Sequence, residues 1–288
     1  LILIMRLSEF RSHFQKTLLE IYSKEETDSI FKRLIDFYFE WDPSYPIINP
    51  NYLLDFNAYE KLKFALSELK KEKPLQYIMN QATFFGIDFY VNQSVLIPRQ
   101  ETEGLVNWVL EDISKNKIVF PNLMDIGTGS GCIAISLANA NKEINVTAID
   151  LSEEALKVAK KNAKQHRVKI DFIKQDIQSL IHWKNPLDII VSNPPYVHPN
   201  EKKEISPNVL NYEPHMALFT PENDPVYYYR LIINFALAVL KSRGSLYFEI
   251  NPRYLELLKS NFSDDTFGEI EVRNDIFGKS RMLKVIKK

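Results

Sequence analysis

The first 80 residues place apolar side chains with the period of a helix. Leu7, Phe10, Phe14, Leu18 and Ile21 recur at intervals of three and four positions. This spacing puts all five on one face of an amphipathic helix. We therefore expect a helix over these positions that buries this face.

Two further helices are predicted before residue 80. Ser23 followed by Glu26 has the form of a capping box, so a second helix is expected to begin there. The segment 42–51 carries three prolines in ten residues and is predicted to be a loop. A third helix is expected to begin at Asn57 and to end before Pro74.

Beyond residue 80 the apolar pattern changes from helices to strands. Aromatic and β-branched residues flank a glycine in the segment 83–91, TFFGIDFYV, which is the signal of a short β-hairpin. From about residue 101, apolar segments alternate with helical ones; they are NLMDIG, VTAID, KIDFI, LDIIVSN, SLYFEI, EIEVRN and MLKVIK. Such alternation indicates an α/β fold with a mostly parallel sheet. Since no helix separates the last two segments, one of them is expected to be antiparallel.

The chain is long enough for two domains. Its 288 residues exceed the size at which a single core usually stops growing, about 100 to 200 residues. The patterns divide it into a helical domain over 1–80, a linking hairpin over 81–98 and an α/β domain over 99–288.

Composition and charge exclude several classes of protein. The net charge is −1, from 36 Lys and Arg against 37 Asp and Glu, so the chain lacks the overall basic character of proteins that neutralise nucleic-acid phosphates. No apolar run approaches the roughly 20 residues that a membrane helix needs. Cys132 is the only cysteine, which excludes an internal disulfide and favours the reducing cytoplasm.

A glycine-rich loop, DIGTGSG over Asp125–Gly131, ends a predicted strand and leads into a predicted helix. Its glycines allow a tight turn and let a ligand approach the backbone, which a Cβ atom would obstruct. The spacing is GxGxG, whereas dinucleotide-binding loops have GxGxxG and seat a pyrophosphate at the helix N-terminus. S-adenosylmethionine carries no phosphate, so this spacing favours it as the cofactor. Taken alone, the loop could also be a generic strand-to-helix turn.

Acidic residues at the ends of the next two strands support this cofactor. Asp150 ends the segment VTAID, where its carboxylate can accept hydrogen bonds from both ribose hydroxyls. Asp176 and Ile177 follow the third strand, where we expect a hydrogen bond to the adenine amino group and an apolar contact with its ring. With these residues in place, a generic turn no longer accounts for the loop.

The sequence predicts no metal site. His166 and His182 lie in no metal-ligand pattern and are expected to be surface residues. Cys132 is expected to be a small apolar helix residue and not a nucleophile. His198 is expected to be a bystander, because the sequence offers it no partner.

The segment SNPPYV, Ser192–Val197, directly follows an apolar strand and is the candidate reaction site. Two successive prolines donate no ladder hydrogen bonds and favour extended backbone, which leaves carbonyl groups free to point at a ligand. The ends of strands line the ligand crevice of an open α/β sheet. Asn193, Pro194, Pro195 and Tyr196 are therefore expected to face the methyl donor.

These groups suit a substrate with a planar NH2 group. The lone pair of an amide nitrogen is delocalised, but accepting its two N–H groups on the Asn193 side-chain oxygen and the Pro194 carbonyl oxygen raises the electron density on nitrogen. The same two oxygens stabilise positive charge that develops during in-line transfer. Tyr196 is expected to pack against the flat face of the amide, and the reaction needs neither a metal nor a covalent intermediate.

Seven motifs lie in order along most of the chain: PLQYI at 74–78, FFG at 84–86, IPRQETE at 97–103, DIGTGSG, NPPY, YEPHMALF at 212–219 and DIFGKSR at 275–281. Together they resemble the release-factor glutamine N5-methyltransferases, which modify the glutamine of the Gly-Gly-Gln tripeptide in translation release factors. The resemblance implies a Rossmann-like seven-stranded methyltransferase domain preceded by a small helical-bundle domain and a linking β-hairpin. This agrees with the division into 1–80, 81–98 and 99–288.

The resemblance also implies roles for individual residues. It assigns substrate contacts to Asn193 through Tyr196, places Arg99, Glu101 and Glu103 at the border of the site, and makes the helical domain the part that recognises a release factor. Gln100 departs from the proline usual in the family, which affects the expected loop shape but not the chemistry. With the strand-end residues included, the candidate contacts with S-adenosylmethionine are Gly127, Thr128, Gly129, Ser130, Gly131, Asp150, Asp176, Ile177 and Asn193.

Other functions remain open. An adenine N6-methyltransferase acting on DNA or RNA would use the same site, but it needs a basic surface to hold a strand, and residues 1–80 carry 11 basic against 12 acidic side chains. Methylation of another protein is a nearer alternative. A non-catalytic cofactor-binding module would not need NPPY, and the glycine spacing disfavours an NAD-dependent oxidoreductase. We expect a protein partner, with no direct contact with nucleic acid and no membrane.

Overall fold

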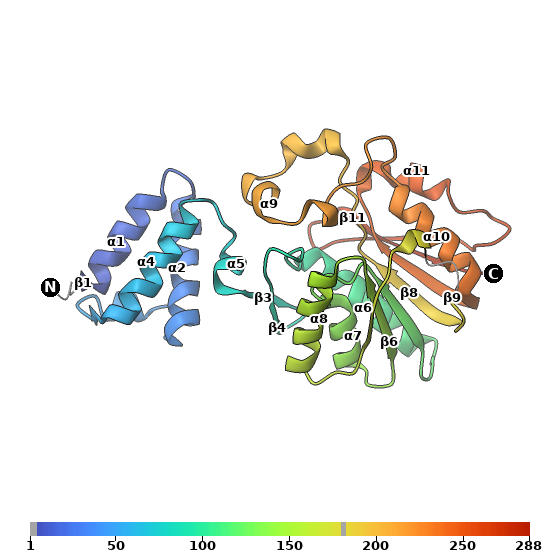
Figure 1. Cartoon of the computed structure of the whole chain (residues 1–288), viewed down its shortest axis with the longest axis horizontal. Coiled ribbons are helices and arrows are strands. Elements are labelled where there is room, and N and C mark those ends of the chain that lie inside the picture. Colours follow the sequence, from blue (N-terminus) through green and yellow to red (C-terminus); the bar gives the residue numbers. More distant parts are fainter. Residues whose placement is uncertain (1–4, 180–182) are drawn as a thin grey trace. The chain divides into compact units, whose positions relative to one another are not determined.

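The computed structural model describes residues 5–179 and 183–288, and the chain divides into two compact units (Figure 1). Unit 1 holds the described residues up to Gln81 together with Pro207–Tyr212. Unit 2 holds the described residues of Ala82–Ser206 and Glu213–Lys288. The sequence pattern does not indicate that Pro207–Tyr212 joins the first unit.

Unit 1 is a small bundle of helices around its own apolar core, to which Leu7, Phe14 and Leu62 contribute. The hydroxyl of Tyr212 donates a hydrogen bond to the carbonyl oxygen of Lys71 (2.6 Å), which ties the late segment to this bundle. The elements are β1 (Met5–Arg6), α1 (Leu7–Leu18), α2 (Lys24–Phe39), α3 (Tyr45–Ile48), β2 (Leu53–Leu54), α4 (Phe56–Leu69), α5 (Leu75–Met79) and α9 (Pro207–Tyr212), with β1 antiparallel to β2.

The first two helices follow the sequence pattern except at one position. The Ser23 side chain accepts a hydrogen bond from the Glu26 backbone N–H (3.1 Å), so the predicted start of α2 is confirmed. α1 ends at Leu18, and Ile21 lies beyond it, 38% exposed. The expectation that Ile21 shares the buried face is therefore wrong.

The boundaries expected around the proline-rich segment need two corrections. Asp55 caps α4 in place of Asn57, because the Ala58 backbone N–H donates to the Asp55 carboxylate (2.8 Å). The expected loop at 42–51 contains the short helix α3. Pro46 lies in its first turn, where the missing N–H of proline costs no helical hydrogen bond.

A seven-stranded sheet forms the middle of unit 2, in the order β10-β11-β9-β8-β5-β6-β7. Neighbours from β9 to β7 run parallel, and β11 is antiparallel to both β9 and β10. The strands are β5 (Asn122–Ile126), β6 (Asn145–Asp150), β7 (Asp171–Lys174), β8 (Leu187–Ser192), β9 (Leu240–Glu249), β10 (Glu271–Asn274) and β11 (Ser280–Ile286). The predicted seven-stranded, mostly parallel sheet is confirmed.

Helices cover both faces of this sheet (Figure 1). One apolar cluster joins the sheet to α6 (Gln100–Lys115), α7 (Cys132–Ala140) and α8 (Glu153–Gln165), and a second joins it to α10 (Tyr227–Val239) and α11 (Leu255–Lys259). Short 3-10 turns complete the chain at η1 (Ile177–Ser179), η2 (Pro199–Glu204), η3 (His215–Ala217) and η4 (Pro252–Tyr254). Among the helices of the described residues, none has the length and apolarity needed to cross a membrane.

The expected hairpin is formed by β3 (Gln81–Phe84) and β4 (Ile87–Tyr90). Both turn residues have positive φ, 51° at Phe85 and 74° at Gly86, which is the geometry of two-residue turns that match the twist of paired strands. Phe89 is fully buried in the cluster that also holds α6 and α7. The hairpin therefore contributes to the core of unit 2.

Candidate active site

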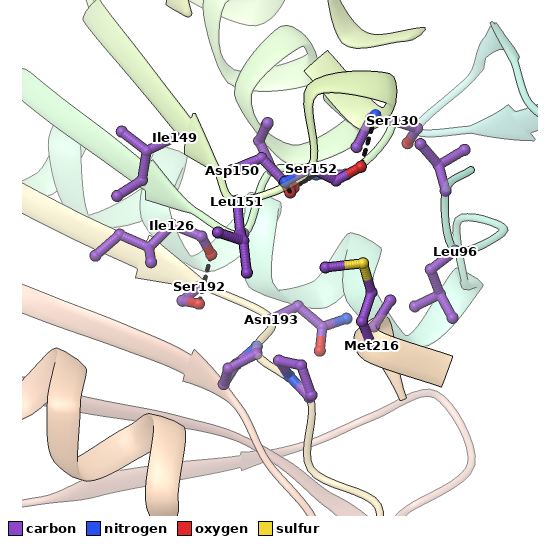
Figure 2. Close-up of a pocket in the computed structure, with 18 of the residues that line it drawn as sticks. Leu96, Ile126, Ser130, Ile149, Asp150, Leu151, Ser152, Ser192, Asn193 and Met216 are labelled. Atoms are coloured by element: carbon purple, nitrogen blue, oxygen red, sulfur yellow. Dashed lines mark hydrogen bonds between the residues drawn. The ribbon is translucent and has the colours of Figure 1, made fainter. Parts of the chain in front are cut away.

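A cavity of about 210 Å³ opens at the carboxyl ends of the parallel strands (Figure 2). It lies where the strand order reverses, with β5 paired to β6 on one side and to β8 on the other, which is where open α/β sheets bind ligands. Gly131 and Tyr196 are not among the described residues that line it. The predicted site residues that do line it are Gly127, Thr128, Gly129, Ser130, Asp150, Asp176, Ile177, Asn193, Pro194 and Pro195.

The loop between β5 and α7 needs glycine for two different reasons. Gly127 and Gly129 have φ of 74° and 55°, and a Cβ added at either would meet no heavy atom within 4 Å. The requirement there is conformational, and open space lies beside the backbone. At Gly131 (φ 81°) a Cβ would come within 2.8 Å of the Ile135 side chain and 3.2 Å of the Ala159 Cβ. Gly131 therefore permits close packing of α7 against α8.

Asp150 ends β6 and holds the glycine loop from the side. Its carboxylate accepts hydrogen bonds from the backbone N–H groups of Gly129 and Ser152, each at 2.8 Å. Burial raises the pKa of this carboxyl, and the backbone hydrogen bonds oppose that rise because they favour the charged form. Each carboxylate oxygen has a further lone pair, so Asp150 can still accept hydrogen bonds from a ribose.

Apolar side chains line the part of the cavity next to Asp150. Leu151 is 51% exposed although it is large and apolar, and Ile177 follows β7 at the same side. Tyr228 and Ile232 contribute from α10. The flat aromatic ring of a ligand could pack against this apolar surface. Leu151 and the α10 pair were not predicted from the sequence, although Leu151 directly follows Asp150 and the pair is spaced by one helical turn.

Hydrogen bonds to neighbouring strand ends anchor both ends of the NPPY loop. The Ser192 hydroxyl donates to the Ile126 carbonyl oxygen (2.6 Å), as Figure 2 shows. The Asn251 side chain donates to the Tyr196 carbonyl oxygen (3.2 Å). Between these anchors the Asn193 side chain points into the cavity (Figure 2). The loop thus presents an amide group at a fixed point beside the cofactor candidates.

Tyr196 contacts a buried carboxylate. Its hydroxyl donates to Glu249 Oε1 (3.0 Å), and its ring packs against the apolar cluster beneath α10. Glu249 ends β9 and is 1% exposed; burial raises its pKa, while hydrogen bonds from Thr102 and Tyr196 oppose the rise. The structure gives Tyr196 an anchoring contact, and its packing against a substrate amide stays a prediction.

A second buried carboxylate joins two segments of the cavity wall, of which the sequence indicated only Arg99 as part of the site. Residues of 94–99 and of 214–217 line the cavity. The Glu213 side chain accepts hydrogen bonds from the Ile97 backbone N–H (3.0 Å) and from the Arg99 guanidinium (2.6 Å). Glu213 is 3% exposed whereas the Arg99 side chain is partly exposed, so a buried carboxylate fixes the two segments to each other.

The three charged residues expected at the border of the site have different positions. Arg99 lines the cavity. Glu103 accepts a hydrogen bond from the Phe85 backbone N–H (2.9 Å) and so holds the hairpin turn. Glu101 is not among the described residues that line the cavity.

His166 and His198 have structural contacts, and the Nε2 of His166 lies 2.8 Å from the Asp88 carbonyl oxygen. His198 caps η2, and its Nε2 lies 2.8 Å from the Glu222 carbonyl oxygen, so it has a partner that the sequence does not reveal. Burial raises the pKa of the Cys132 thiol to about 12, which keeps it protonated near neutral pH. His182 lies outside the described residues. Within 5–179 and 183–288, no three side chains of His, Cys, Asp or Glu are grouped to hold a metal ion.

Comparison with known proteins relates the whole chain to methyltransferases. The family model of the methyltransferase small domain matches residues 106–212. A release factor glutamine methyltransferase of Flavobacterium psychrophilum is 42% identical over 98% of this chain and 99% of its own length. One of Bacteroides thetaiotaomicron, with the same name, is 36% identical over 96% of this chain and 99% of its own length.

Solved structures are similar in fold. The hMettl16 catalytic domain in complex with an RNA hairpin has a TM-score of 0.55 at 16% identity, covering 83% of this chain and 85% of its own. A 16S rRNA methyltransferase of T. thermophilus in complex with AdoMet and guanosine has a TM-score of 0.51 at 18% identity, covering 72% of this chain and 50% of its own. At these identities the likeness concerns the fold alone.

Proposed function

The chain belongs to the family of release factor glutamine methyltransferases, and from this premise we propose that it methylates a glutamine side chain of a release factor, with S-adenosylmethionine as methyl donor. The observation that carries the proposal is the 42% identity to the Flavobacterium psychrophilum enzyme, because the match covers nearly the full length of both proteins. The target is the amide nitrogen, N5, of the glutamine in the Gly-Gly-Gln motif.

The residues around the cavity fit S-adenosylmethionine. Open space lies beside Gly127 and Gly129, and the Asp150 carboxylate next to them can bind ribose hydroxyls. Leu151 and Ile177 offer apolar contacts for adenine, with the Asp176 carboxylate available to its amino group. When bound, S-adenosylmethionine supplies an electrophilic methyl group on a positively charged sulfur.

Asn193 and Pro194 act on the glutamine amide in the proposed reaction. The Asn193 Oδ1 and the Pro194 carbonyl oxygen accept its two N–H groups, which raises the electron density on nitrogen and aims it at the methyl carbon. The nitrogen forms a bond to that carbon as the S–C bond breaks, sulfur keeps the bonding pair, and one N–H proton leaves to solvent. The two acceptors stabilise the positive charge that develops on nitrogen.

Mass spectrometry of a full-length release factor tests the proposal. After incubation with the protein and S-adenosylmethionine, the Gly-Gly-Gln glutamine should gain the mass of one methyl group. A release factor in which this glutamine is replaced by asparagine should stay unmodified. An unmodified factor alongside methylated adenine in added DNA or RNA would instead favour the adenine N6-methyltransferase.

The proposal also assigns a role to each of the three segments of the chain. Family membership does not favour the adenine alternative. We assign recognition of the release factor to residues 1–80, the link to 81–98 and the chemistry to 99–288. The partner is then a protein and not a nucleic acid, and the reaction belongs to the cytoplasm, where release factors act.

A further inference from the structure

The Asn193 side chain has a hydrogen-bond partner that belongs to neither the cofactor loop nor the NPPY motif. Its Nδ2 lies 3.4 Å from Oγ1 of Thr102 on α6, and that Oγ1 lies 2.5 Å from Oε2 of Glu249. The other oxygen of Glu249 accepts the Tyr196 hydroxyl (3.0 Å). A chain of polar contacts therefore runs from a buried carboxylate to the amide that points into the cavity.

The chemistry of these groups fixes the direction of the hydrogen bonds. A carboxylate only accepts hydrogen bonds, so the single hydroxyl proton of Thr102 is donated to Glu249. The Thr102 oxygen can then only accept from Asn193, which makes Nδ2 the atom that faces it. The Asn193 Oδ1 is left toward the cavity as an acceptor. This is the orientation that a substrate NH2 group requires.

The burial of Thr102 and Glu249 stabilises this hydrogen-bond arrangement. Thr102 is 2% exposed and Glu249 is 1% exposed, so water cannot readily replace either partner, and an unpaired polar group there would be costly. The contact between Asn193 and Thr102 is long (3.4 Å), and hydrogen bonds of catalytic groups often shorten when the reacting complex forms.

We propose that Thr102 and Glu249 are positioning residues that hold the Asn193 amide with its oxygen toward the substrate. The inference rests on the proposed function, since it concerns how that reaction's acceptor is oriented. A flipped amide would present N–H groups to the N–H groups of glutamine, and one of the two acceptors would be lost. In this role Thr102 and Glu249 act through Asn193.

Two substitutions of Thr102 test the inference in the full-length chain with a full-length release factor as substrate. Thr102→Ser keeps the hydroxyl, whereas Thr102→Val replaces it with a methyl group of similar size. Thr102→Val should lower kcat about 10- to 100-fold, the loss that small misplacements of a reacting group cause. KM for the factor and Kd for S-adenosylhomocysteine should change by less than about threefold. Thr102→Ser should keep most of the turnover.

Combining the Thr102 substitution with Asn193→Ala distinguishes a positioning role of Thr102 from a general structural role. In an Asn193→Ala background no amide is left to orient, so adding Thr102→Val should slow the reaction by less than about threefold. Equal turnover of the Val and Ser variants, or a full Val effect without the Asn193 amide, would overturn the inference while the proposed function stands. A wild-type protein that methylates no release factor would overturn both. Thr102→Ala serves as the hydroxyl-free variant if the melting temperature shows that Thr102→Val does not fold.

Discussion

In the proposed reaction, Asn193 is the single residue expected to act most directly on the substrate amide. Asn193→Ala removes one of two acceptors for the charge that develops on nitrogen, so kcat should fall about 100-fold or more. Turnover of a full-length release factor measures the effect. Asn200→Ala, at an exposed position of the following η2 turn, serves as the control and should leave turnover unchanged. Near-normal turnover of Asn193→Ala would remove Asn193 from the mechanism.

Asp150 is the residue on which binding of the methyl donor should depend. Asp150→Ala removes hydrogen bonds between a carboxylate and the ribose, so the affinity should weaken by about 1.5 to 3 kcal/mol. Titration calorimetry with S-adenosylmethionine gives the value directly. Glu154→Ala, on the exposed face of α8, should bind like the wild type. Unchanged affinity in a folded Asp150→Ala variant would contradict the assignment.

The sequence locates Asp150 and Asn193 because each follows a recognisable apolar strand, and strand ends line the crevice of such sheets. It does not locate Thr102 and Glu249. These residues are 147 positions apart, and neither lies in a pattern that predicts contact with the other. Only the packing of α6 against the sheet brings them together, so their role follows from the tertiary structure.

At the scale of elements, the junction of β5, α7 and α8 depends on Gly131. Gly131→Ala adds a Cβ 3.2 Å from the Ala159 Cβ and 2.8 Å from the end of the Ile135 side chain, at a φ of 81°. Strain of about 1–2 kcal/mol therefore adds to overpacking against Ala159, of about 1–3 kcal/mol at most. Gly127→Ala meets no such contact and should lower the free energy of unfolding by the strain alone. Urea denaturation of the two variants gives the difference. If both variants lost the same free energy of unfolding, the Cβ added at Gly131 would not be overpacking the junction of α7 and α8.

The length of an element decides whether the sequence predicts it. The central strand β8 of unit 2 is a nearly continuous apolar segment, as expected for a strand covered by helices on both faces, and the long helices show a clear period. α3, α5 and α9 have four, five and six residues, which is too short for a period to show. Their positions depend on contacts with distant parts of the chain, such as that of Tyr212 with Lys71.

At the scale of the whole molecule, the free energy of unfolding should depend on pH through a buried carboxyl. Burial raises the pKa of Asp125 from 3.8 to about 7. Because the folded state holds this proton more tightly, the contribution to stability is complete below about pH 4 and is lost as the pH rises past about 7. Asp125→Asn abolishes this titration. Its free energy of unfolding should therefore rise relative to that of the wild type as the pH rises from about 4 to about 7.

Urea denaturation at a series of pH values measures the difference between the Asp125→Asn variant and the wild type. The same substitution at the exposed Asp265 controls for the change in net charge. A difference that stays constant between about pH 4 and pH 8 would show that Asp125 does not titrate in the folded protein in this range.

Recognition of the substrate should involve more than the Gly-Gly-Gln tripeptide. If residues 1–80 bind the release factor away from the cavity, that binding energy helps to orient the glutamine, and a short peptide lacks it. We expect kcat/KM for a full-length factor to exceed that for a Gly-Gly-Gln peptide by at least about 100-fold. Comparable values would place all of the recognition at the cavity.

During translation, unit 1 cannot be complete until α9 (Pro207–Tyr212) has been synthesised. Residues 82–206 are synthesised between the main part of unit 1 and α9, and about 125 residues at about 5–20 residues per second take roughly 6–25 s. Until then the Lys71 carbonyl oxygen lacks the Tyr212 hydroxyl that donates to it in the finished protein. A nascent chain can bury the core of its first helices early. It completes this unit only after the parallel strands β5 to β8 have been translated, so unit 1 is completed while unit 2 is still being synthesised.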